Sequence, residues 1–360
     1  MVRNQFERSG SSPDLSNGSY TVLNFIIRRL FHAIPVLLGV SIIVFFGMHV
    51  IPGDVAQMIL GDKATPQTLA HLREQLGLNQ SIFIQYWKFI SNACAGDFGT
   101  SLRTQNPVWQ DIWTAFPVTV QLSVVSLLFA LVVGIPIGVR AAVKQNGWFD
   151  NIAMVGVLIG ISMPVFWIGL ILMIVVGVKF DLLPISGMLS DSITLQRITG
   201  MSILDSLLSR NFEAFWDTIK HLILPMATLG TIPTAVIARI TRMAMLDVLK
   251  QDYMRTAWAK GLRYYPITYY HALKNALIPV ITVTGLQFGA LLGGAILTET
   301  VFGLPGLGRL AVNSILYRDY PEVQGIVMMA SAVFVLVNLI VDVLYAVVDP
   351  RIRLDMEVET

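Results

Sequence analysis

Residues 303–309, GLPGLGR, come nearest in this sequence to a phosphate-binding loop. A nucleotide-binding loop of that kind ends in a lysine followed by serine or threonine, and its backbone amides surround the phosphates. Here an arginine follows the last glycine, and Pro305 removes one amide. We therefore expect a tight turn at this place, and we expect any ATP hydrolysis to be carried out by another chain.

Other catalytic signatures are missing from the sequence. It contains no His-Glu-x-x-His or Gly-x-Ser-x-Gly motif, and its five histidines are scattered. The single cysteine, Cys94, cannot form an intrachain disulfide, and no Cys/His cluster has metal-ligand spacing. We expect no catalytic residue, no metal site and no cofactor in this chain.

One apolar segment near the C-terminus carries a polar stripe with spacings of seven, four, three and four residues. That spacing places the stripe on one helix face, which in a membrane should meet protein or water. Two interpretations stay open for its aspartate at 342: a role in a transport pathway, or a structural role near the helix end before Pro350. The stripe consists of Ser331, Asn338, Asp342, Tyr345 and Asp349.

The segment 247–275 is too long for a simple connector and is predicted to form short helices. Its residues 252–262, DYMRTAWAKGL, mix apolar and basic groups, and Gly261 could cap a helix. Such a helix suits docking into a partner's groove. Alternatively, it lies in the lipid headgroup layer with Trp258 as its anchor.

The composition indicates the environment of these segments. With 54% hydrophobic and 13% charged residues, the chain is too apolar for an ordinary soluble domain. Its net charge of +2 and the lack of a basic, aromatic-rich patch give no reason to expect a nucleic-acid partner. We predict an all-α integral membrane protein with six spans of roughly 20 residues. They are Phe31–Val50, Val118–Ala142, Ile152–Val178, His221–Ile240, Leu277–Leu297 and Gly325–Val348.

Charge placement predicts the orientation of the spans. Fifteen of the 25 Lys and Arg residues lie in the tails and in the two connections on the same side, which favours cytoplasmic N- and C-termini. The polar start of the chain does not resemble a signal peptide, so the first span should be an uncleaved anchor. The predicted regions are a tail (1–25), a first helix with a large outer loop (26–117), a core (118–350) and a second tail (351–360).

Small residues indicate how the spans pack. Glycines recur every four residues at 134 and 138, at 156 and 160, and at 285, 289 and 293, which allows helix backbones to approach closely in lipid. Pro225 and Pro233 interrupt the fourth segment, although such breaks are tolerated between neighbouring helices. The outer segment 188–220 is expected to be helical around Ile203–Trp216.

The segment 247–275 resembles the Glu-Ala-Ala, three residues, Gly motif of permeases from binding-protein-dependent ATP-binding-cassette importers. Arg255-Thr256-Ala257 stands at the Glu-Ala-Ala position, Gly261 has the expected spacing, and Ile278-Pro279 corresponds to the distal Leu-Pro. The arginine and the more distant proline are departures from the general motif, and both are similar to the oligopeptide/dipeptide branch.

Further similarities to that branch extend over nearly the whole chain beyond the tail. The long outer loop after Pro52-Gly53-Asp54 is similar to the B-type permease of the pair. The other matching stretches include GDFG (96–99) with Ser101, LPISG (183–187), FGLPGLG (302–308), RDYP (318–321) and DPRIR (349–353).

The resemblance implies a type I, MetI-like bundle that pairs with a homologous second permease. It also implies two cytoplasmic ATPase subunits, which bind ATP and Mg, and an extracytoplasmic solute-binding protein. It favours partner docking over the lipid-lying helix and assigns coupling to the ATPases to one set of residues. These are Asp252, Arg255, Thr256, Ala257, Lys260, Gly261 and Pro279.

The resemblance implies peptides, of the dipeptide or oligopeptide class, as the transported solute, with a nickel chelate, glutathione or an oligosaccharide as alternatives. An ion-coupled secondary transporter would show inverted repeats and charged sites near the membrane midplane. The only carboxylate well inside a predicted span is Asp342, which argues against both that reading and an intramembrane aspartyl protease.

Overall fold

The computed structural model describes residues 17–50, 55–60, 64–75 and 77–348, which fold into helices joined by turns. The predicted tail 351–360 and residues 1–16 lie outside the described residues. The helices of 15 residues or more are α1 (Asn17–Val50), α5 (Val108–Val143), α6 (Trp148–Ser162), α9 (Phe212–Leu249), α11 (Leu273–Val301) and α13 (Tyr320–Val348). The shorter ones are α2 (Val55–Leu60), α3 (Pro66–Gln75), α4 (Ile82–Cys94), α7 (Val165–Leu172), α8 (Ser202–Leu208), α10 (Asp252–Ala259) and α12 (Leu307–Leu316), with two π-helical turns, η2 (Met173–Lys179) and η3 (Pro266–Ala272).

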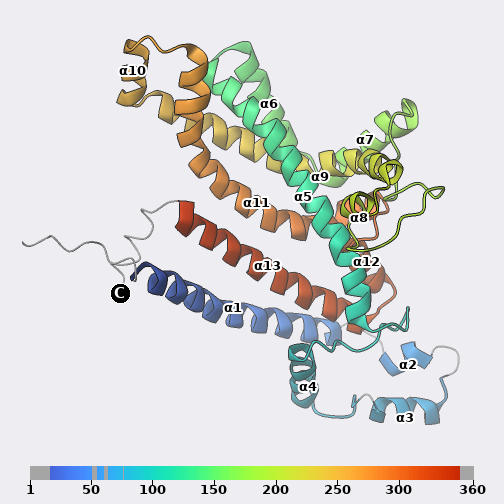
Figure 1. Cartoon of the computed structure of the whole chain (residues 1–360). Helices are drawn as coiled ribbons and strands as arrows, with labels where there is room; N and C mark the ends of the chain where they lie inside the picture. Colours follow the sequence, from blue (N-terminus) through green and yellow to red (C-terminus); the bar gives the residue numbers. More distant parts are fainter. Residues whose placement is uncertain (1–16, 51–54, 61–63, 76, 349–360) are drawn as a thin grey trace, which may run out of the picture.

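The long helices form a bundle whose short helices gather at its two ends (Figure 1). At one end lie α10 and η3, together with the α5–α6 turn, the start of α1 and the end of α13. At the other end lie α2, α3, α4, α8 and α12. We call these the α10 end and the α12 end. Because α1 starts and α13 ends at the same end, the described chain makes an even number of passages.

Five helices are long and apolar enough to cross a membrane, and a bent pair brings the number to as many as six. This confirms the predicted all-helical membrane bundle. The pair consists of α6 and the helix Val165–Lys179, which meet at 107°. The five continuous candidates are Ile27–Val50, Val108–Val143, Phe212–Leu249, Pro266–Gly293 and Tyr320–Val341.

The predicted span Ile152–Val178 is not one continuous helix. The helix stops at Ser162, and Met163 has an extended backbone (φ −87°, ψ 137°) before Pro164. A residue before proline is pushed out of the helical region by the proline ring, which accounts for the break. After the bend, α7 runs into η2, and both belong to the α12 end (Figure 1).

The fourth span, in contrast, is one continuous helix. Pro225 and Pro233 both lie inside α9, which is the most buried of the five candidate spans. Neighbouring helices therefore support the backbone where proline removes a hydrogen bond. Because α9 reaches Leu249, Arg239 and Arg242 lie in a helix and not in the connecting loop predicted from hydropathy.

The most extensive helix contact in the bundle joins α5 to α9. A Cβ atom added at Gly138 would lie 2.5 Å from the Ala238 carbonyl oxygen, and one at Gly134 would lie 2.9 Å from the Thr234 carbonyl oxygen. This glycine pair therefore allows the backbones to touch, as predicted. The other predicted glycines divide: a Cβ at Gly285 would lie 2.6 Å from Val341 Cγ1 of α13, whereas a Cβ at Gly156 or Gly293 would have no neighbour within 4 Å.

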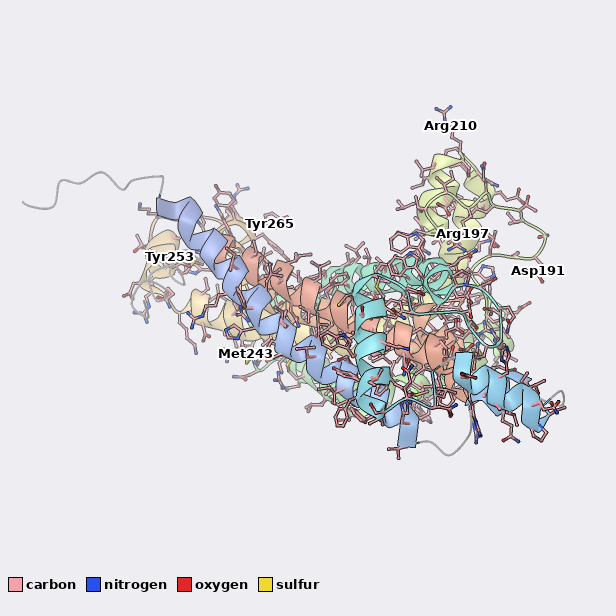
Figure 2. All side chains as sticks on the ribbon, turned by 90° about the horizontal axis from the view of Figure 1, so that it is seen from below. Asp191, Arg197, Arg210, Met243, Tyr253 and Tyr265 are labelled. Atoms are coloured by element: carbon pink, nitrogen blue, oxygen red, sulfur yellow. The ribbon has the colours of Figure 1, made fainter. Side chains whose placement is uncertain are left out.

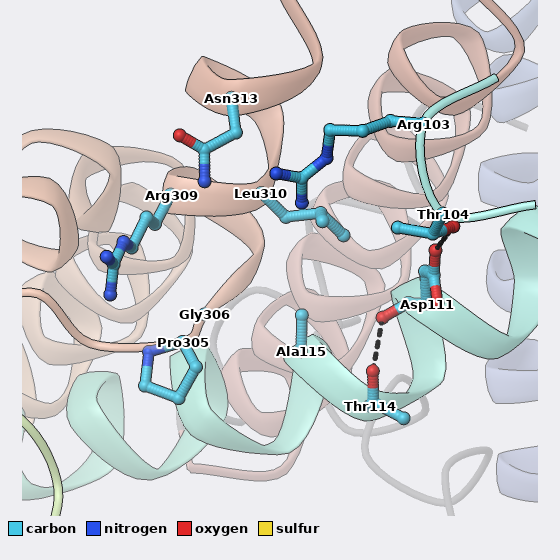
Figure 3. Close-up of a pocket in the computed structure, with 10 residues that line it drawn as sticks. All are labelled: Arg103, Thr104, Asp111, Thr114, Ala115, Pro305, Gly306, Arg309, Leu310 and Asn313. Carbon is cyan, nitrogen blue, oxygen red and sulfur yellow. Dashed lines mark hydrogen bonds between the residues drawn. The ribbon is translucent and has the colours of Figure 1, made fainter. Parts of the chain in front are cut away.

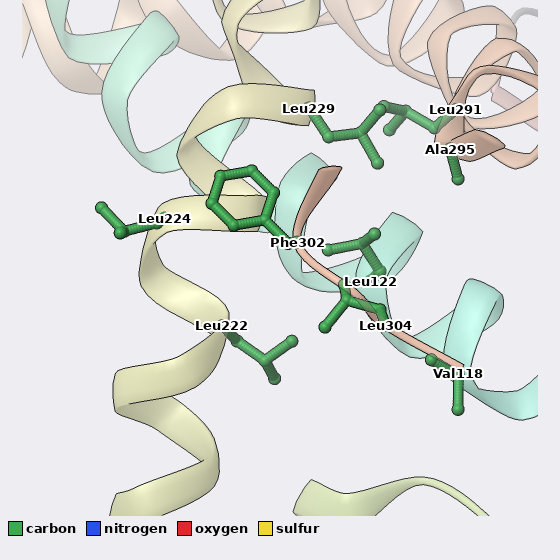
Figure 4. Packing of buried hydrophobic residues seen from close by; sticks show 9 residues of the cluster. All are labelled: Val118, Leu122, Leu222, Leu224, Leu229, Leu291, Ala295, Phe302 and Leu304. Carbon is green, nitrogen blue, oxygen red and sulfur yellow. The ribbon is translucent and has the colours of Figure 1, made fainter. Parts of the chain in front are cut away.

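Two apolar clusters hold the two ends of the bundle together. The cluster at the α12 end joins α5, α9 and α11 to the turn after α11, and Phe302 and Leu304 of that turn are buried in it (Figure 4). The cluster at the α10 end joins α5 and α9 to α10, η3 and α11 through residues including Met245, Met254 and Ile267. The short helix α10 is thus packed at its end of the bundle, and at the other end Leu307 of α12 is buried in a separate cluster with Val108 and Ile112 of α5.

The outer segment 188–220 is only partly helical. α8 ends at Leu208, and Arg210 takes a left-handed backbone (φ 54°) before Asn211 caps α9 by accepting a hydrogen bond from the Ala214 amide. The predicted helix around Ile203–Trp216 is therefore interrupted. The segment that carries Asp191, Arg197 and Arg210 projects from the bundle (Figure 2).

Candidate functional site

The predicted docking segment forms a complete short helix, α10. Asp252 lies in its first turn, where a negative charge interacts favourably with the helix dipole. The Thr256 hydroxyl donates a hydrogen bond of 3.1 Å to the Asp252 carbonyl oxygen. Gly261 ends the helix with φ +73°. The Gly261 amide donates to the Trp258 carbonyl and the Leu262 amide to the Ala257 carbonyl, which is the Schellman pattern. The predicted glycine cap is confirmed.

The α10 helix has one buried face and one exposed face. Met254 is completely buried in the apolar cluster of the α10 end, and Ala257 packs against that cluster. Arg255 and Asp252 form an ion pair of 3.5 Å on the exposed face, where such a pair contributes little stability. The predicted residues Asp252, Arg255, Thr256, Lys260 and Gly261 are all exposed.

Aromatic side chains extend this exposed face. Trp258 is 49% exposed, and Tyr253 and Tyr265 are exposed at the same end of the molecule (Figure 2). The Asn275 amide donates to the Tyr253 hydroxyl at 2.8 Å, which ties α10 to the start of α11. Pro279, predicted as the distal part of the motif, lies exposed inside α11. The α10 helix packs against η3, the turn that precedes α11.

A buried ion pair stands behind this end of the bundle. The Arg242 guanidinium of α9 donates through Nε to Asp150 Oδ1 at 2.5 Å and through Nη2 to Asp150 Oδ2 at 2.7 Å. Asp150, near the start of α6, is only 2% exposed and also accepts from the Asn146 amide. This bidentate ion pair fixes the α5–α6 turn to α9.

The predicted polar stripe is described only in part. Ser331 donates to the Val327 carbonyl of its own helix. Asn338 faces α11, since its Oδ1 would lie 3.4 Å from a Cβ added at Gly289. Asp342 and Tyr345 belong to α13, but their side chains, like Asp349, lie outside the described residues. A pathway role for this stripe stays a prediction.

A polar site that the sequence did not predict lies at the α12 end. Glu299, fully buried near the end of α11, accepts hydrogen bonds from the Thr119 hydroxyl at 2.6 Å, the Gly308 amide at 2.7 Å and the Arg309 amide at 3.2 Å. Thr119 in turn accepts from the Leu307 amide. The first three amides of α12 are therefore all satisfied by these two side chains.

This contact explains the glycine-rich stretch 303–309. Gly303 makes the predicted turn with φ +65°, but α12 already begins at Leu307. A Cβ at Gly306 would lie 2.3 Å from the Glu299 carboxyl carbon, and one at Gly308 would lie 2.3 Å from the Ile296 Cα. The two later glycines are needed because α12 begins directly against α11.

A second buried cluster lies at the start of α13. The Ser101 hydroxyl lies 2.6 Å from Asp319 Oδ2 and 3.1 Å from Glu322 Oε2, and all three residues are buried. The Arg103 amide also donates to Asp319. These contacts hold the loop before α5 onto α13. Within the residues that the structure describes, no group of three or more His, Cys, Asp or Glu is arranged to hold a metal ion.

The comparison with known proteins agrees with this architecture. Residues 134–354, which contain α10, match the family described as "Binding-protein-dependent transport system inner membrane component". Residues 22–123 match its N-terminal component. The chain belongs to this family. Its members are transport permeases of the inner membrane, not enzymes.

Curated relatives match the permease over almost its whole length. A dipeptide transport system permease protein DppB from Alkalihalophilus pseudofirmus is 47% identical over 332 residues, which are 92% of this chain and all of the relative. DppB of Escherichia coli is 45% identical over 336 residues, covering 92% and 99%. A glutathione transport system permease protein GsiC from Salmonella paratyphi A is 42% identical over 332 residues, covering 92% and 99%.

The buried carboxylate of Glu299 was not identified from the sequence. The α11 helix continues past the predicted span end at Leu297 and carries Glu299 beyond the candidate span Pro266–Gly293. Thr298, Glu299 and Thr300 lower the hydropathy of that stretch, so a search for apolar segments stops before it. The run of glycines from 303 to 308 was the available signal that another group approaches closely.

Proposed function

We propose that this permease carries short peptides across the cytoplasmic membrane as one of two paired permeases. Two separate ATPase subunits would drive it, and an external solute-binding protein would deliver the peptide. The observation that carries this proposal is α10, a capped helix that presents charged and aromatic side chains outward while Met254 anchors it in the bundle. The similarity to dipeptide transport permeases supports a peptide as the solute.

In this proposal the α10 end faces the cytoplasm, where ATP is available. The basic residues Arg255, Lys260 and Arg263 lie at that end, in agreement with the excess of positive charge on cytoplasmic loops. The α12 end would then face outward and meet the solute-binding protein. Its projecting loop around Arg197 and Arg210 offers a surface for that contact (Figure 2).

The contacts of α10 support a mechanical coupling to the opposite end. Movement of α10 would pass through Met254 and Ile267 into η3, and through the hydrogen bond between Tyr253 and Asn275 into α11. The α11 helix runs to the α12 end, where Glu299 accepts hydrogen bonds from two amides in the first turn of α12. One helix thus joins the proposed ATPase contact to the proposed outer end. The π-helical turn at its start is a form often found at functional positions.

Glutathione is the second candidate solute, because a glutathione permease is 42% identical to this chain over a similar length. Glutathione is itself a small peptide with free carboxylates, so both candidate solutes require a pathway that accepts a small, charged peptide. Uptake of labelled dialanine and labelled glutathione by the same reconstituted importer would separate them.

The first experiment is gentle purification of the permease from its native membrane, followed by identification of the copurifying chains. We expect a second, homologous permease and ATPase subunits, with ATP hydrolysis stimulated by a solute-loaded binding protein. Recovery of the permease alone, with uptake that collapses when the ion gradient is dissipated, would replace the proposal with ion-coupled transport.

A pair of variants at Gly261 tests the docking role of α10. A Cβ at Gly261 would have no neighbour within 4 Å, so a side chain there starts in open space. Gly261→Glu and Gly261→Asn both place a side chain on a left-handed residue, but asparagine tolerates that backbone and adds no charge. We expect the glutamate variant to lose ATP-driven uptake and the asparagine variant to keep most of it. Equal uptake by both would argue against a partner at this surface.

A further inference from the structure

A cavity of about 290 Å³ opens at the α12 end between the start of α5 and α12 (Figure 3). Arg103, Thr104 and Asp111 line one side, and Arg309, Leu310 and Asn313 line the other. This volume is close to the lower limit, about 300 Å³, of pockets that take small ligands. It suits a molecule of dipeptide size.

Two guanidinium groups in this cavity lack a carboxylate partner. Arg103 is held 5.1 Å above the centre of the Tyr317 ring, and Arg309 donates through Nη1 to the Gly303 carbonyl. Among the described residues, neither arginine has an acidic oxygen within 4.0 Å. Both therefore keep donors for an anion, and a guanidinium matches the geometry of a carboxylate especially well.

The backbone of α12 cannot take over this role. The amides of Leu307, Gly308 and Arg309 already donate to Thr119 and Glu299 behind the cavity. An anion in the cavity would therefore be bound by the two arginine side chains and not by the helix N-terminus. The same hydrogen bonds fix the wall that carries Arg309.

The cavity also holds a negative group and an apolar surface. Asp111 is 8% exposed, and its carboxylate accepts hydrogen bonds from the Thr104 hydroxyl at 2.5 Å and from the side-chain amide of Asn106 at 3.0 Å. These contacts fix the carboxylate at the edge of the cavity (Figure 3). Ala115 and Leu310 supply apolar surface. Cations on the walls, an anion at the edge and apolar surface together match a zwitterion with short side chains.

We propose that this cavity is a peptide-binding site of the permease itself, in which Arg103 and Arg309 bind the C-terminal carboxylate and Asp111 faces the ammonium group. The inference rests on the proposed function, since it takes a peptide as the transported solute. It places a receiving site at the end of the bundle where the binding protein would release its cargo.

The test uses the complete importer in proteoliposomes with a saturating amount of its binding protein loaded with dialanine. Arg103→Gln and Arg309→Gln should each lower dialanine uptake about tenfold, because each variant loses a charge-assisted hydrogen bond to the peptide carboxylate. Arg103→Lys should recover part of the uptake. Lys88→Gln, which removes an exposed charge from α4 at the same end, should leave uptake unchanged.

Stimulation of ATP hydrolysis by the loaded binding protein separates this role from docking. We expect stimulation to stay normal in Arg103→Gln, so that uptake falls for each ATP consumed. A parallel fall in stimulation would mean that the arginines hold the binding protein, and wild-type uptake by both glutamine variants would mean that they hold nothing; either result overturns the site. Arg103 is exposed, so its variant serves if Arg309→Gln fails to assemble. Absence of peptide uptake by the wild-type importer would overturn the proposed function itself.

Discussion

The Thr119 hydroxyl of α5 donates a hydrogen bond of 2.6 Å to the carboxylate of Glu299 in α11, although 180 residues separate the two in sequence. Glu299 also accepts from two amides of α12, so this one carboxylate joins three helices. The carboxylate is completely buried, so its hydrogen bonds are shielded from bulk water. The contact is a buried polar connection among α5, α11 and α12 at the α12 end.

Replacing this carboxylate should loosen the α12 end. In Glu299→Gln, the side-chain NH₂ group would face amide donors of α12, and the unpaired groups should cost about 1–3 kcal/mol of folding free energy. We expect a lower unfolding temperature of the purified permease in detergent and faster hydrogen exchange at residues 307–310. The exposed Glu213→Gln, in the first turn of α9, is the matched control. Unchanged exchange in α12 would show that the cap is not needed.

The ion pair between Asp150 and Arg242 leads to a second prediction. Asp150→Asn leaves a guanidinium without its charged partner, and loss of one partner of a buried pair costs about 3–5 kcal/mol. We expect the lower end of that range, because Arg242 keeps 20% of its side chain exposed. The measurement is thermal unfolding in detergent, with Asp247→Asn on the exposed side of α9 as control.

A double variant distinguishes charge from packing at that site. Asp150→Leu combined with Arg242→Met removes both charges and keeps apolar volume, so it should recover most of the lost stability. If the double variant were as unstable as Asp150→Asn, the pair would act through its geometry and not through an uncompensated charge.

The loop before α8 should respond to acid. Asp205 is buried, which raises its pKa, but hydrogen bonds from the Thr199 hydroxyl and from the Thr199 and Gly200 amides outweigh burial and hold the pKa below its ordinary value of 3.8. A carboxyl whose pKa is lowered by folding stabilises the fold above its unfolded pKa and loses that contribution as the pH falls through the folded value. We therefore expect the loop 198–205 to be protected at pH 6, and its protection to begin to fall near about pH 4 and to fall further as the pH approaches the lowered pKa of folded Asp205.

Hydrogen exchange of this loop, corrected for the intrinsic effect of pH, measures that opening. Asp205→Asn should remove most of the pH dependence and leave the loop partly open at every pH. The exposed Asp191→Asn, in the same projecting segment, should behave like the wild type. Protection that stays constant as the pH falls from 6 through the folded pKa of Asp205 would contradict the assignment to Asp205.

The sequence predicted the features that depend on local patterns. Long apolar segments located five spans, and the spacing of Gly261 after Asp252 predicted the length and cap of α10. These features were predictable because hydropathy and left-handed glycine act over a few neighbouring residues. The bend at Pro164 was missed because hydropathy averaged over a segment is the same for a straight and a bent helix.

The polar contacts at the α12 end depend on tertiary structure and could not be read in the same way. Nothing local to Thr119 indicates a partner at Glu299, and Ser101 meets Asp319 across 218 residues. The segment predicted from hydropathy ends before Glu299, because the polar residues Thr298 and Thr300 flank it. The cavity between Arg103 and Arg309 follows from these contacts, so it too was hidden in the sequence.

The anchoring of α10 gives the last prediction. Met254 is fully buried, whereas Met243 in the neighbouring part of α9 is 42% exposed (Figure 2). Met254→Ala should cost about 2–5 kcal/mol of packing free energy and loosen α10 from η3. Met243→Ala removes the same groups from an exposed position and should be close to neutral. Arg255→Ala changes the outward face while leaving this packing intact.

Uptake and ATP hydrolysis by the reconstituted importer then separate anchoring from docking. If α10 transmits force, Met254→Ala should hydrolyse ATP with little uptake, because the ATPases would still meet the same outward face on a helix that yields. Arg255→Ala should instead weaken recovery of the ATPase subunits with the permease. Normal uptake by Met254→Ala, together with faster hydrogen exchange in α10, would show that a rigid link through this helix is not required for transport.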